Sequence, residues 1–350
     1  MAIDPLVIIF LSSGLFLGWA LGANDAANVF GTAVGTKMVS WRTAAIICSI
    51  CVLLGALFSG AGTTETLGKL GAISALPGAF MTALSAGFSV FIMTKGGLPV
   101  STSQAIVGAI IGWNVFSQKP TDTGILLKIL STWILCPLLA GIIAVLLVQF
   151  IRFVSRRVAI HMITLDAIKR IALIFAGGLG AYALGANNIA NVVGVFIPVQ
   201  PFPTLELGNF NISSAQQLLL LGGLSIGLGV FTYSRKVMDT VGSQLGSLSA
   251  TTALIAVMSH SIVLFMFASR GLETVLSNLG LPTIPLVPVS SSQAVVGAII
   301  GISILKGVAS INWAVLGKII LGWILAPAVA FVICFIGLFF LQNVFALKVI

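Results

Sequence analysis

The sequence predicts an all-α polytopic membrane protein, built as two inverted-topology repeats with broken helices and re-entrant hairpins. Charged residues make up only 7% of the 350 residues, against about 25% in an average globular protein. The mean hydropathy is +1.17, and two polar motifs recur in the same order in both halves. A soluble domain of this size could not cover its surface with so few charges. This composition therefore excludes a soluble enzyme, a secreted disulfide scaffold and a disordered protein.

Long runs without any charged residue are the candidate membrane segments, because a membrane helix needs about 20 residues. They cover residues 5–24, 43–64, 70–94, 96–118, 129–151, 171–205, 207–234, 240–269, 274–305 and 319–347. Prolines such as Pro77, Pro201 and Pro285 interrupt several runs, so we expect some interrupted helices or re-entrant hairpins. Acidic Asp4 stands where a signal peptide would have a basic region. We therefore expect the first run to be a membrane helix and not a removable signal peptide.

A basic segment separates the two halves. It contains Arg152, Arg156, Arg157, Lys169 and Arg170 against the single acid Asp166. Positive charge collects in cytoplasmic loops, which also accounts for the net charge of +9 without a nucleic-acid partner. The mixed apolar and basic pattern favours an amphipathic helix at the membrane surface. We therefore predict a first repeat over 1–150, a basic amphipathic cytoplasmic linker over 151–170 and a second repeat over 171–350.

The internal repeat is evident from three pairs of matching segments. LGANDAANVFG at 21–31 returns as LGANNIANVVG at 184–194, with 8 of 11 residues identical. PVSTSQAIVGAIIG at 99–112 returns as PVSSSQAVVGAIIG at 288–301, with 12 of 14 identical, and WILCPLLA at 133–140 answers WILAPAVA at 323–330. The order is the same in both halves, so the chain contains two homologous repeats.

The charge pattern predicts that the repeats are inverted. The loop after the first motif contains Lys37 and Arg42 and is expected in the cytoplasm, whereas its counterpart in the second half has Glu206 and no base. Opposite charge in equivalent loops requires an odd number of crossings per repeat. Inverted repeats with broken helices and a site near the membrane midplane are typical of secondary transporters.

The first polar cluster contains an acid within a membrane-length segment. It consists of Asn24, Asp25 and Asn28, matched by Asn187, Asn188 and Asn191. A carboxylate at membrane depth costs roughly 2.5–3.5 kcal/mol on insertion scales, so Asp25 is a functional candidate. The alternative is an acid that reaches the membrane interface.

The second cluster consists of Ser101, Thr102, Ser103 and Gln104, matched by Ser290, Ser291, Ser292 and Gln293. Each tetrad follows a Pro-Val pair and precedes an apolar run, which predicts a helix start with a hydroxyl cap. Free N–H groups and the positive end of the helix dipole favour an anion there. The alternative is that these are ordinary caps or helix-packing serines.

An anion beside Asp25 needs a compensating positive charge. No Lys or Arg lies in either motif pair, so a cation enters with the anion or Asp25 is protonated. Amide carbonyls, hydroxyls and one carboxylate form an oxygen ligand set suited to sodium. His260 lies alone in an apolar run without a visible partner, and we expect it to be a packed core histidine rather than a proton shuttle.

The two GAN motifs and the two tetrads resemble the duplicated signatures of the inorganic phosphate transporter (PiT) family, which includes the sodium-phosphate symporters of animals. The resemblance covers essentially the whole chain. It implies inverted repeats, an extracellular N-terminus, a central cytoplasmic linker and cation-coupled phosphate uptake, often by a homodimer. The short linker is similar to that of prokaryotic members, which implies a multi-pass protein of a prokaryotic cell membrane. The second signature has Asn188 where the first has Asp25, so a single carboxylate is available.

We therefore expect a secondary active transporter and not an enzyme: a symporter of inorganic phosphate, with sodium as coupling ion and no other cofactor. A proton-coupled or metal-phosphate symporter, a carrier of sulfate or another oxyanion and an anion channel are the alternatives. The residues expected to bind phosphate are Asp25, Asn28, Ser101, Thr102, Ser103, Asn191, Ser290, Ser291 and Ser292. Those expected to bind sodium are Asn24, Asp25, Gln104, Asn187, Asn188 and Gln293.

Overall fold

The computed structural model describes residues 4–95, 100–157, 161–207, 210–244, 249–307 and 313–350. Within these residues the regular secondary structure is helical, apart from one antiparallel hairpin of β1 (Leu205–Leu207) and β2 (Phe210–Ile212). The predicted all-α class is confirmed. Pro99, which precedes the first tetrad, lies outside the described residues.

The helices follow the two halves of the sequence. The first half contains α1 (Pro5–Ala26), the π-helical turn η1 (Ala27–Gly31), α2 (Thr32–Gly35), α3 (Trp41–Ser59), α4 (Ala61–Gly71), α5 (Leu76–Lys95), α6 (Thr102–Ser117) and α7 (Thr123–Ser155). The second half contains α8 (Met162–Val193), the 3-10 turn η2 (Gly194–Phe196), α9 (Ser214–Gln244), α10 (Ala250–Met266), α11 (Arg270–Asn278), α12 (Ser291–Lys306) and α13 (Trp313–Asn343).

Seven helical segments of the described chain are long and apolar enough to cross a membrane, and α10 with α11 forms a further apolar pair bent by 66°. The seven are Pro5–Gly35, Trp41–Ser59, Leu76–Lys95, Thr123–Ser155, Thr164–Phe196, Ser214–Met238 and Leu316–Asn343. Large apolar side chains such as Phe58, Ile134 and Phe175 are more than 70% exposed, at 77%, 73% and 71%. Such side chains on the surface of a membrane helix face lipid. The protein is a multi-pass membrane protein.

The interruptions of the helices lie before the tetrads. Val100 and Ser101 precede α6 without helical structure, and residues 281–290 form a longer non-helical segment before α12. The two Asn motifs lie in continuous helix: Asn188 is inside α8, and α1 continues through η1 into α2. The first motif is nonetheless marked by the π-helical turn, a feature frequent at functional sites.

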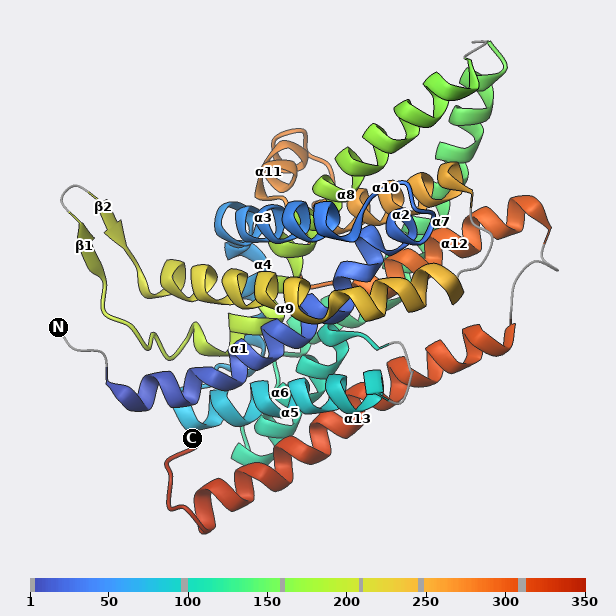
Figure 1. The fold of residues 1–350 in the computed structure, drawn as a ribbon. Coiled ribbons are helices and arrows are strands. Elements are labelled where there is room, and N and C mark those ends of the chain that lie inside the picture. Colours follow the sequence, from blue (N-terminus) through green and yellow to red (C-terminus); the bar gives the residue numbers. More distant parts are fainter. Residues whose placement is uncertain (1–3, 96–99, 158–160, 208–209, 245–248, 308–312) are drawn as a thin grey trace.

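The basic segment does not form a helix of its own. Helix α7 continues to Ser155 and α8 begins at Met162, so the expected surface helix consists of the ends of two long helices. Residues 158–160 of the segment lie outside the described residues. Figure 1 shows these two helix ends projecting together from the rest of the molecule.

Corresponding helices of the two halves exchange partners across the molecule. Helix α1 packs on α9 while α8 packs on α3, and α6 packs on α13 while α12 packs on α7. The closest crossings are matched as well. A Cβ on Gly108 would overlap the carbonyl of Pro327, and a Cβ on Gly297 would overlap the carbonyl of Pro137. Small residues let membrane helices approach this closely, and here the same contact is made twice with the halves interchanged.

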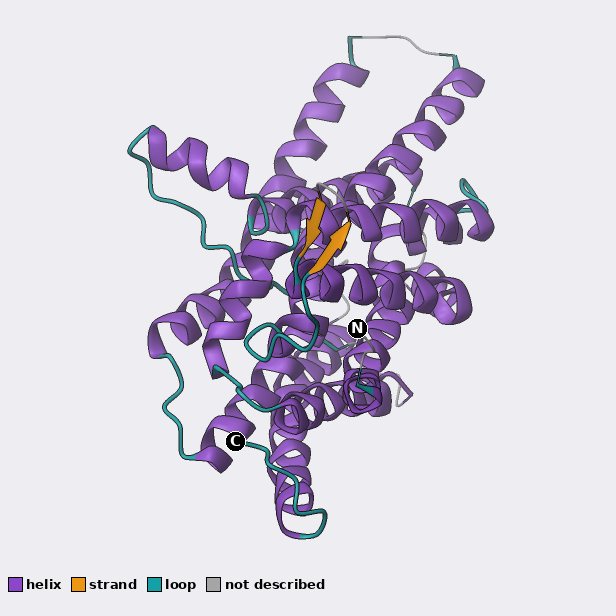
Figure 2. Cartoon of the chain, turned by 90° about the vertical axis from the view of Figure 1, so that its left-hand side faces the viewer, coloured by secondary structure: helices purple, strands orange, loops and turns teal. Residues whose placement is uncertain are grey.

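Corresponding helices also run in opposite directions. In Figure 1, α1 starts at the side of the two termini and α8 starts at the opposite end. The α2–α3 connection, which contains Lys37, and the β-hairpin, which contains Glu206, lie at opposite ends of the helices. Figure 2, viewed from the side of the termini, has the hairpin facing the reader. These directions agree with the predicted inversion, whose orientation in the bilayer stays a prediction.

Candidate anion and cation site

The two tetrads form the N-terminal turns of α6 and α12. Ser101 Oγ accepts from the backbone N of Gln104 at 3.3 Å, and Ser290 Oγ accepts from the backbone N of Gln293 at 3.2 Å. The predicted helix starts and hydroxyl caps are confirmed. Because Ser101 and Ser290 satisfy backbone N–H groups, the hydroxyls left for other partners are those of the next two residues in each tetrad.

Asparagines of each motif helix reach the tetrad of the opposite repeat. Asn28 Nδ2 donates to Ser291 Oγ at 2.9 Å, and Asn191 Nδ2 donates to Ser103 Oγ at 2.9 Å. Ser103 Oγ in turn donates to the carbonyl of Val289 at 2.9 Å, next to the second tetrad. These bonds bring all four sequence motifs into one cluster at the centre of the fold.

Asn187 supports the non-helical segment before α12. Its Nδ2 donates to the carbonyl of Val287 at 3.0 Å, and its Oδ1 accepts from the backbone N of Val289 at 2.7 Å. Both ends of the amide are bound to backbone. Asn187, which we expected as a sodium ligand, is thus bonded to the backbone that leads into the second tetrad.

Asp25 is buried, with 3% of its surface exposed, and is bonded to two neutral amides. Asn24 Nδ2 donates to its Oδ1 at 3.0 Å, and Asn188 Nδ2 donates to its Oδ2 at 3.3 Å. No basic side chain of the described residues forms an ion pair with this carboxylate. A buried carboxylate with only amide partners favours a bound cation or proton.

Several oxygens of the cluster are buried without a hydrogen-bond donor within the described chain. They are Thr102 Oγ1, Gln104 Oε1, Asn188 Oδ1, Asn191 Oδ1 and Gln293 Oε1. Leaving a buried acceptor unsatisfied costs about 1–3 kcal/mol, so such groups need an explanation. Four of the five are amide carbonyls, which are ligands of hard cations. The cluster thus combines two helix N-termini, which favour an anion, with unpaired oxygens, which favour a cation.

The comparisons with known proteins agree with this chemistry. The model of a family described as the phosphate transporter family matches residues 21–282 and 274–349. The chain belongs to the phosphate transporter family. The resemblance predicted from the motifs is confirmed, and so is the expectation of a transporter.

Relatives within the phosphate transporter family match along nearly their whole length. Proteins named "Putative phosphate permease" from Thermococcus kodakarensis and Pyrococcus horikoshii are 27% and 28% identical, with 93% and 95% of this chain and 95% and 96% of theirs covered. One from Methanocaldococcus jannaschii is 28% identical over 92% of this chain and 93% of its own. A solved structure described as the sodium-dependent phosphate transporter has a TM-score of 0.74 at 23% identity, covering 97% of this chain and 99% of that one, which establishes the shared fold.

In this family member the predicted site residues come together and most of them are buried. Asn24 and Asn28 are half-buried, and every other residue predicted to bind phosphate or sodium is buried. The partly exposed side of the cluster therefore lies at these two asparagines, which are bonded to Asp25 and to Ser291.

Two residues at the cluster were missed from the sequence. His260 is buried, as expected of a core histidine, and it has a polar partner that the sequence did not indicate: its Nε2 lies 2.8 Å from Ser291 Oγ. Trp323 Nε1 donates to Ser292 Oγ at 3.3 Å. The repeated WIL segments included this tryptophan, but nothing in the spacing connects residue 323 with residue 292. His260 was recognisable as the one ionisable group in its apolar run.

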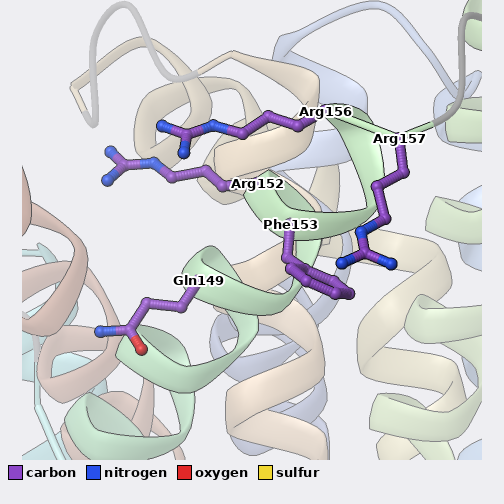
Figure 3. A pocket seen from close by; sticks show the side chains of 5 residues that line it. All are labelled: Gln149, Arg152, Phe153, Arg156 and Arg157. Atoms are coloured by element: carbon purple, nitrogen blue, oxygen red, sulfur yellow. The ribbon is translucent and has the colours of Figure 1, made fainter.

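A basic cavity of about 380 Å³ lies away from this cluster, at the end of α7. It is lined by Gln149, Arg152, Phe153, Arg156 and Arg157. Figure 3 shows the guanidinium groups of Arg152 and Arg156 pointing the same way, while Arg157 turns toward the Phe153 ring, 4.3 Å from its centroid. None of the motif residues lines this cavity, so it is separate from the motif cluster. Its position agrees with a cytoplasmic end for α7.

Proposed function

We propose that the protein is a sodium-coupled symporter of inorganic phosphate in the cell membrane. The observation that supports this most strongly is the meeting of two hydroxyl-bearing helix N-termini with buried oxygens that have no donor among the described residues. The family supplies phosphate as the substrate class. The similar solved structure is described as sodium-dependent, and sodium suits a ligand set of amide, hydroxyl and carboxylate oxygens.

In this proposal both ions contact Asp25, which also accepts the hydrogen of a protonated phosphate, and their other ligands differ. Phosphate lies against the N-terminal turns and is bound by Thr102, Ser291 and Ser292, with Asn28 behind them. Ser103, held by Asn191 and donating to the Val289 carbonyl, supports the start of the second tetrad. Sodium is bound by Asp25 together with the unpaired carbonyls of Gln104, Asn188 and Gln293. Ser101 and Ser290 act mainly as helix caps, and Asn187 positions the backbone before α12. Charge compensation couples the ions, because the anion binds beside Asp25 only when a cation is present.

Uptake of labelled phosphate into proteoliposomes tests this function. A sodium gradient is expected to drive phosphate above its external concentration, and an equal potassium gradient is not. Rapid phosphate equilibration without any cation dependence indicates an anion channel instead. Unlabelled sulfate in excess is expected to leave the uptake unchanged, and strong competition by sulfate overturns the substrate assignment.

Proton-coupled symport is the second candidate, and one observation favours it. His260 and Asp25 are both ionisable and buried, and His260 touches the second tetrad. In the same proteoliposomes, an inward proton gradient without sodium drives phosphate accumulation only if protons replace sodium as the coupling ion.

We also propose that the protein is a homodimer. Cross-linking in native membranes tests this oligomeric state.

A further inference from the structure

His260 contacts the proposed anion site from a helix that contains none of the sequence motifs. It lies on α10, has no exposed surface, and its Nε2 is 2.8 Å from Ser291 Oγ. The non-helical residues 281–290 return the chain from α11 to the start of α12 and so place Ser291 against it. Ser291 Oγ also accepts from Asn28 Nδ2 at 2.9 Å. One hydroxyl is therefore bonded by residues from α10 and from η1.

The donors and acceptors at Ser291 permit two arrangements. A serine hydroxyl has one hydrogen and two lone pairs, and Asn28 takes one lone pair. If His260 Nε2 has its hydrogen, it donates to the second lone pair, and the serine hydrogen points away from both partners. If Nε2 has none, it accepts the serine hydrogen, and Ser291 has nothing left to donate.

The other ring nitrogen decides between these arrangements. His260 Nδ1 is buried without a hydrogen-bond partner in the described residues. A buried N–H without an acceptor is rarer in proteins than an unused acceptor lone pair. The tautomer with hydrogen on Nε2 leaves only a lone pair at Nδ1, so the surroundings of the ring favour it.

We propose that His260 is a positioning residue that donates from Nε2 to Ser291 Oγ and thereby directs the Ser291 hydroxyl hydrogen at the bound phosphate. With both lone pairs occupied by Asn28 and His260, the hydroxyl can act only as a donor to the anion. The inference rests on the proposed function, because it assumes that the second tetrad binds phosphate.

The first repeat has no equivalent histidine. The histidines of the chain are His161 and His260, so residues 1–150 contain none. Thr102, the counterpart of Ser291, has an Oγ1 without a partner in the described chain. Of these two counterparts, Ser291 has a hydroxyl oriented by its partners, which limit it to donating.

The test is a double-mutant cycle in proteoliposomes, with labelled phosphate uptake measured at saturating sodium. Ser291→Ala and His260→Leu are each expected to raise the phosphate KM about tenfold, which is typical for losing one hydrogen bond to a charged group. In the Ser291→Ala background, His260→Leu is expected to add less than about twofold, because both changes remove the same interaction. The sodium concentration for half-maximal uptake should stay the same in every variant.

Two further substitutions distinguish positioning from packing. In His260→Gln the side-chain amide can place an N–H near the position of Nε2, so the phosphate KM should return to near the unmodified value. In His260→Asn the shorter amide does not reach Ser291, and the KM should stay raised. Ser261→Ala is the matched control, because this neighbour on α10 bonds to the carbonyls of Val257 and Ala176 and not to the tetrad.

The outcomes separate this inference from the proposed function. If Ser291→Ala leaves the phosphate KM unchanged, the second tetrad does not bind phosphate and the proposed function loses its anion site. If Ser291→Ala raises the KM but His260→Leu has the same effect in both backgrounds, the positioning role is wrong. Equal phosphate KM values for His260→Gln and His260→Asn also overturn the positioning role. This comparison decides the question even if His260→Leu does not fold.

Discussion

Asn188 donates its side-chain amide to Asp25, with Nδ2 3.3 Å from Oδ2. The two residues occupy equivalent positions of the two GAN motifs. Asn188 stands where an exact repeat would have a second aspartate, and it is bonded directly to Asp25. Two carboxylates this close would repel each other and raise the cost of burial, whereas the amide stabilises the charged form of Asp25 and leaves its own Oδ1 free for a cation.

Asp25→Asn tests the role of this single carboxylate. Because it removes the negative charge of the proposed sodium site, we expect the sodium concentration for half-maximal phosphate uptake to rise at least about tenfold. Phosphate still has a proton to donate to Asp25 and sulfate has none, so the preference for phosphate over sulfate should fall as well. Sodium titrations and sulfate competition measure the two effects.

Asp4→Asn, at the exposed N-cap of α1, is the control for Asp25→Asn. An unchanged phosphate-to-sulfate preference would leave Asp25 as a cation ligand only.

Thr102→Ala tests the anion site on the first tetrad. Thr102 Oγ1 is buried and has no hydrogen-bond partner among the described residues, so removing it breaks no hydrogen bond within them. Removing a hydroxyl that binds a charged group costs about 1.5–3 kcal/mol, or ten- to a hundredfold in the phosphate KM. Thr102→Ser keeps the hydroxyl and should behave like the unmodified protein. Uptake at saturating sodium measures the difference. A KM in Thr102→Ala that matches Thr102→Ser excludes this hydroxyl from binding phosphate.

Gly297→Ala tests the exchanged packing of the two repeats. The added methyl group would overlap the carbonyl of Pro137, and over-packing of this kind typically costs about 1–3 kcal/mol. We expect a lower Tm in detergent, and the same from Gly108→Ala, which is the matching contact in the other half. Gly317→Ala is the control, because no atom lies within 4 Å of a Cβ built there. A Tm equal to that of the control contradicts the close crossing.

Cysteine labelling tests the inverted topology. Lys37→Cys and Glu206→Cys, in a background without the four native cysteines, should react with a membrane-impermeant reagent from opposite sides. Basic residues favour the cytoplasm, so Lys37→Cys is expected to react only from inside. Intact cells and inside-out vesicles supply the two sides. Labelling of both positions from one side shows that the repeats are not inverted.

The sequence predicted the all-α membrane fold and the internal repeat because these depend on composition and on matching motifs. The four clusters around Asp25, Asn188, Thr102 and Ser291 were found because polar side chains stand out within apolar runs. Their meeting follows from the two-fold repeat, which pairs Asn28 with the second tetrad and Asn191 with the first.

Contacts between the motifs and other segments could not be predicted from the sequence. His260 meets Ser291 only because residues 281–290 form an extended return, whose path is decided by tertiary packing. At the Asn motifs, Asn28 and Asn191 bond to the tetrads of the opposite repeat while their own backbone stays helical. The two ends of the basic linker are helical as parts of α7 and α8, because apolar residues within the linker continue the apolar pattern of these two helices.

The most direct test of coupled transport is the flux of labelled sodium driven by phosphate. Proteoliposomes are prepared with equal sodium on both sides and a phosphate gradient directed inward, with the membrane potential set to zero. The account predicts that labelled sodium accumulates inside above its external concentration, that the accumulation collapses when the phosphate gradient is removed, and that Thr102→Ala reduces it. Sodium that stays at equilibrium while phosphate enters would contradict sodium-coupled symport.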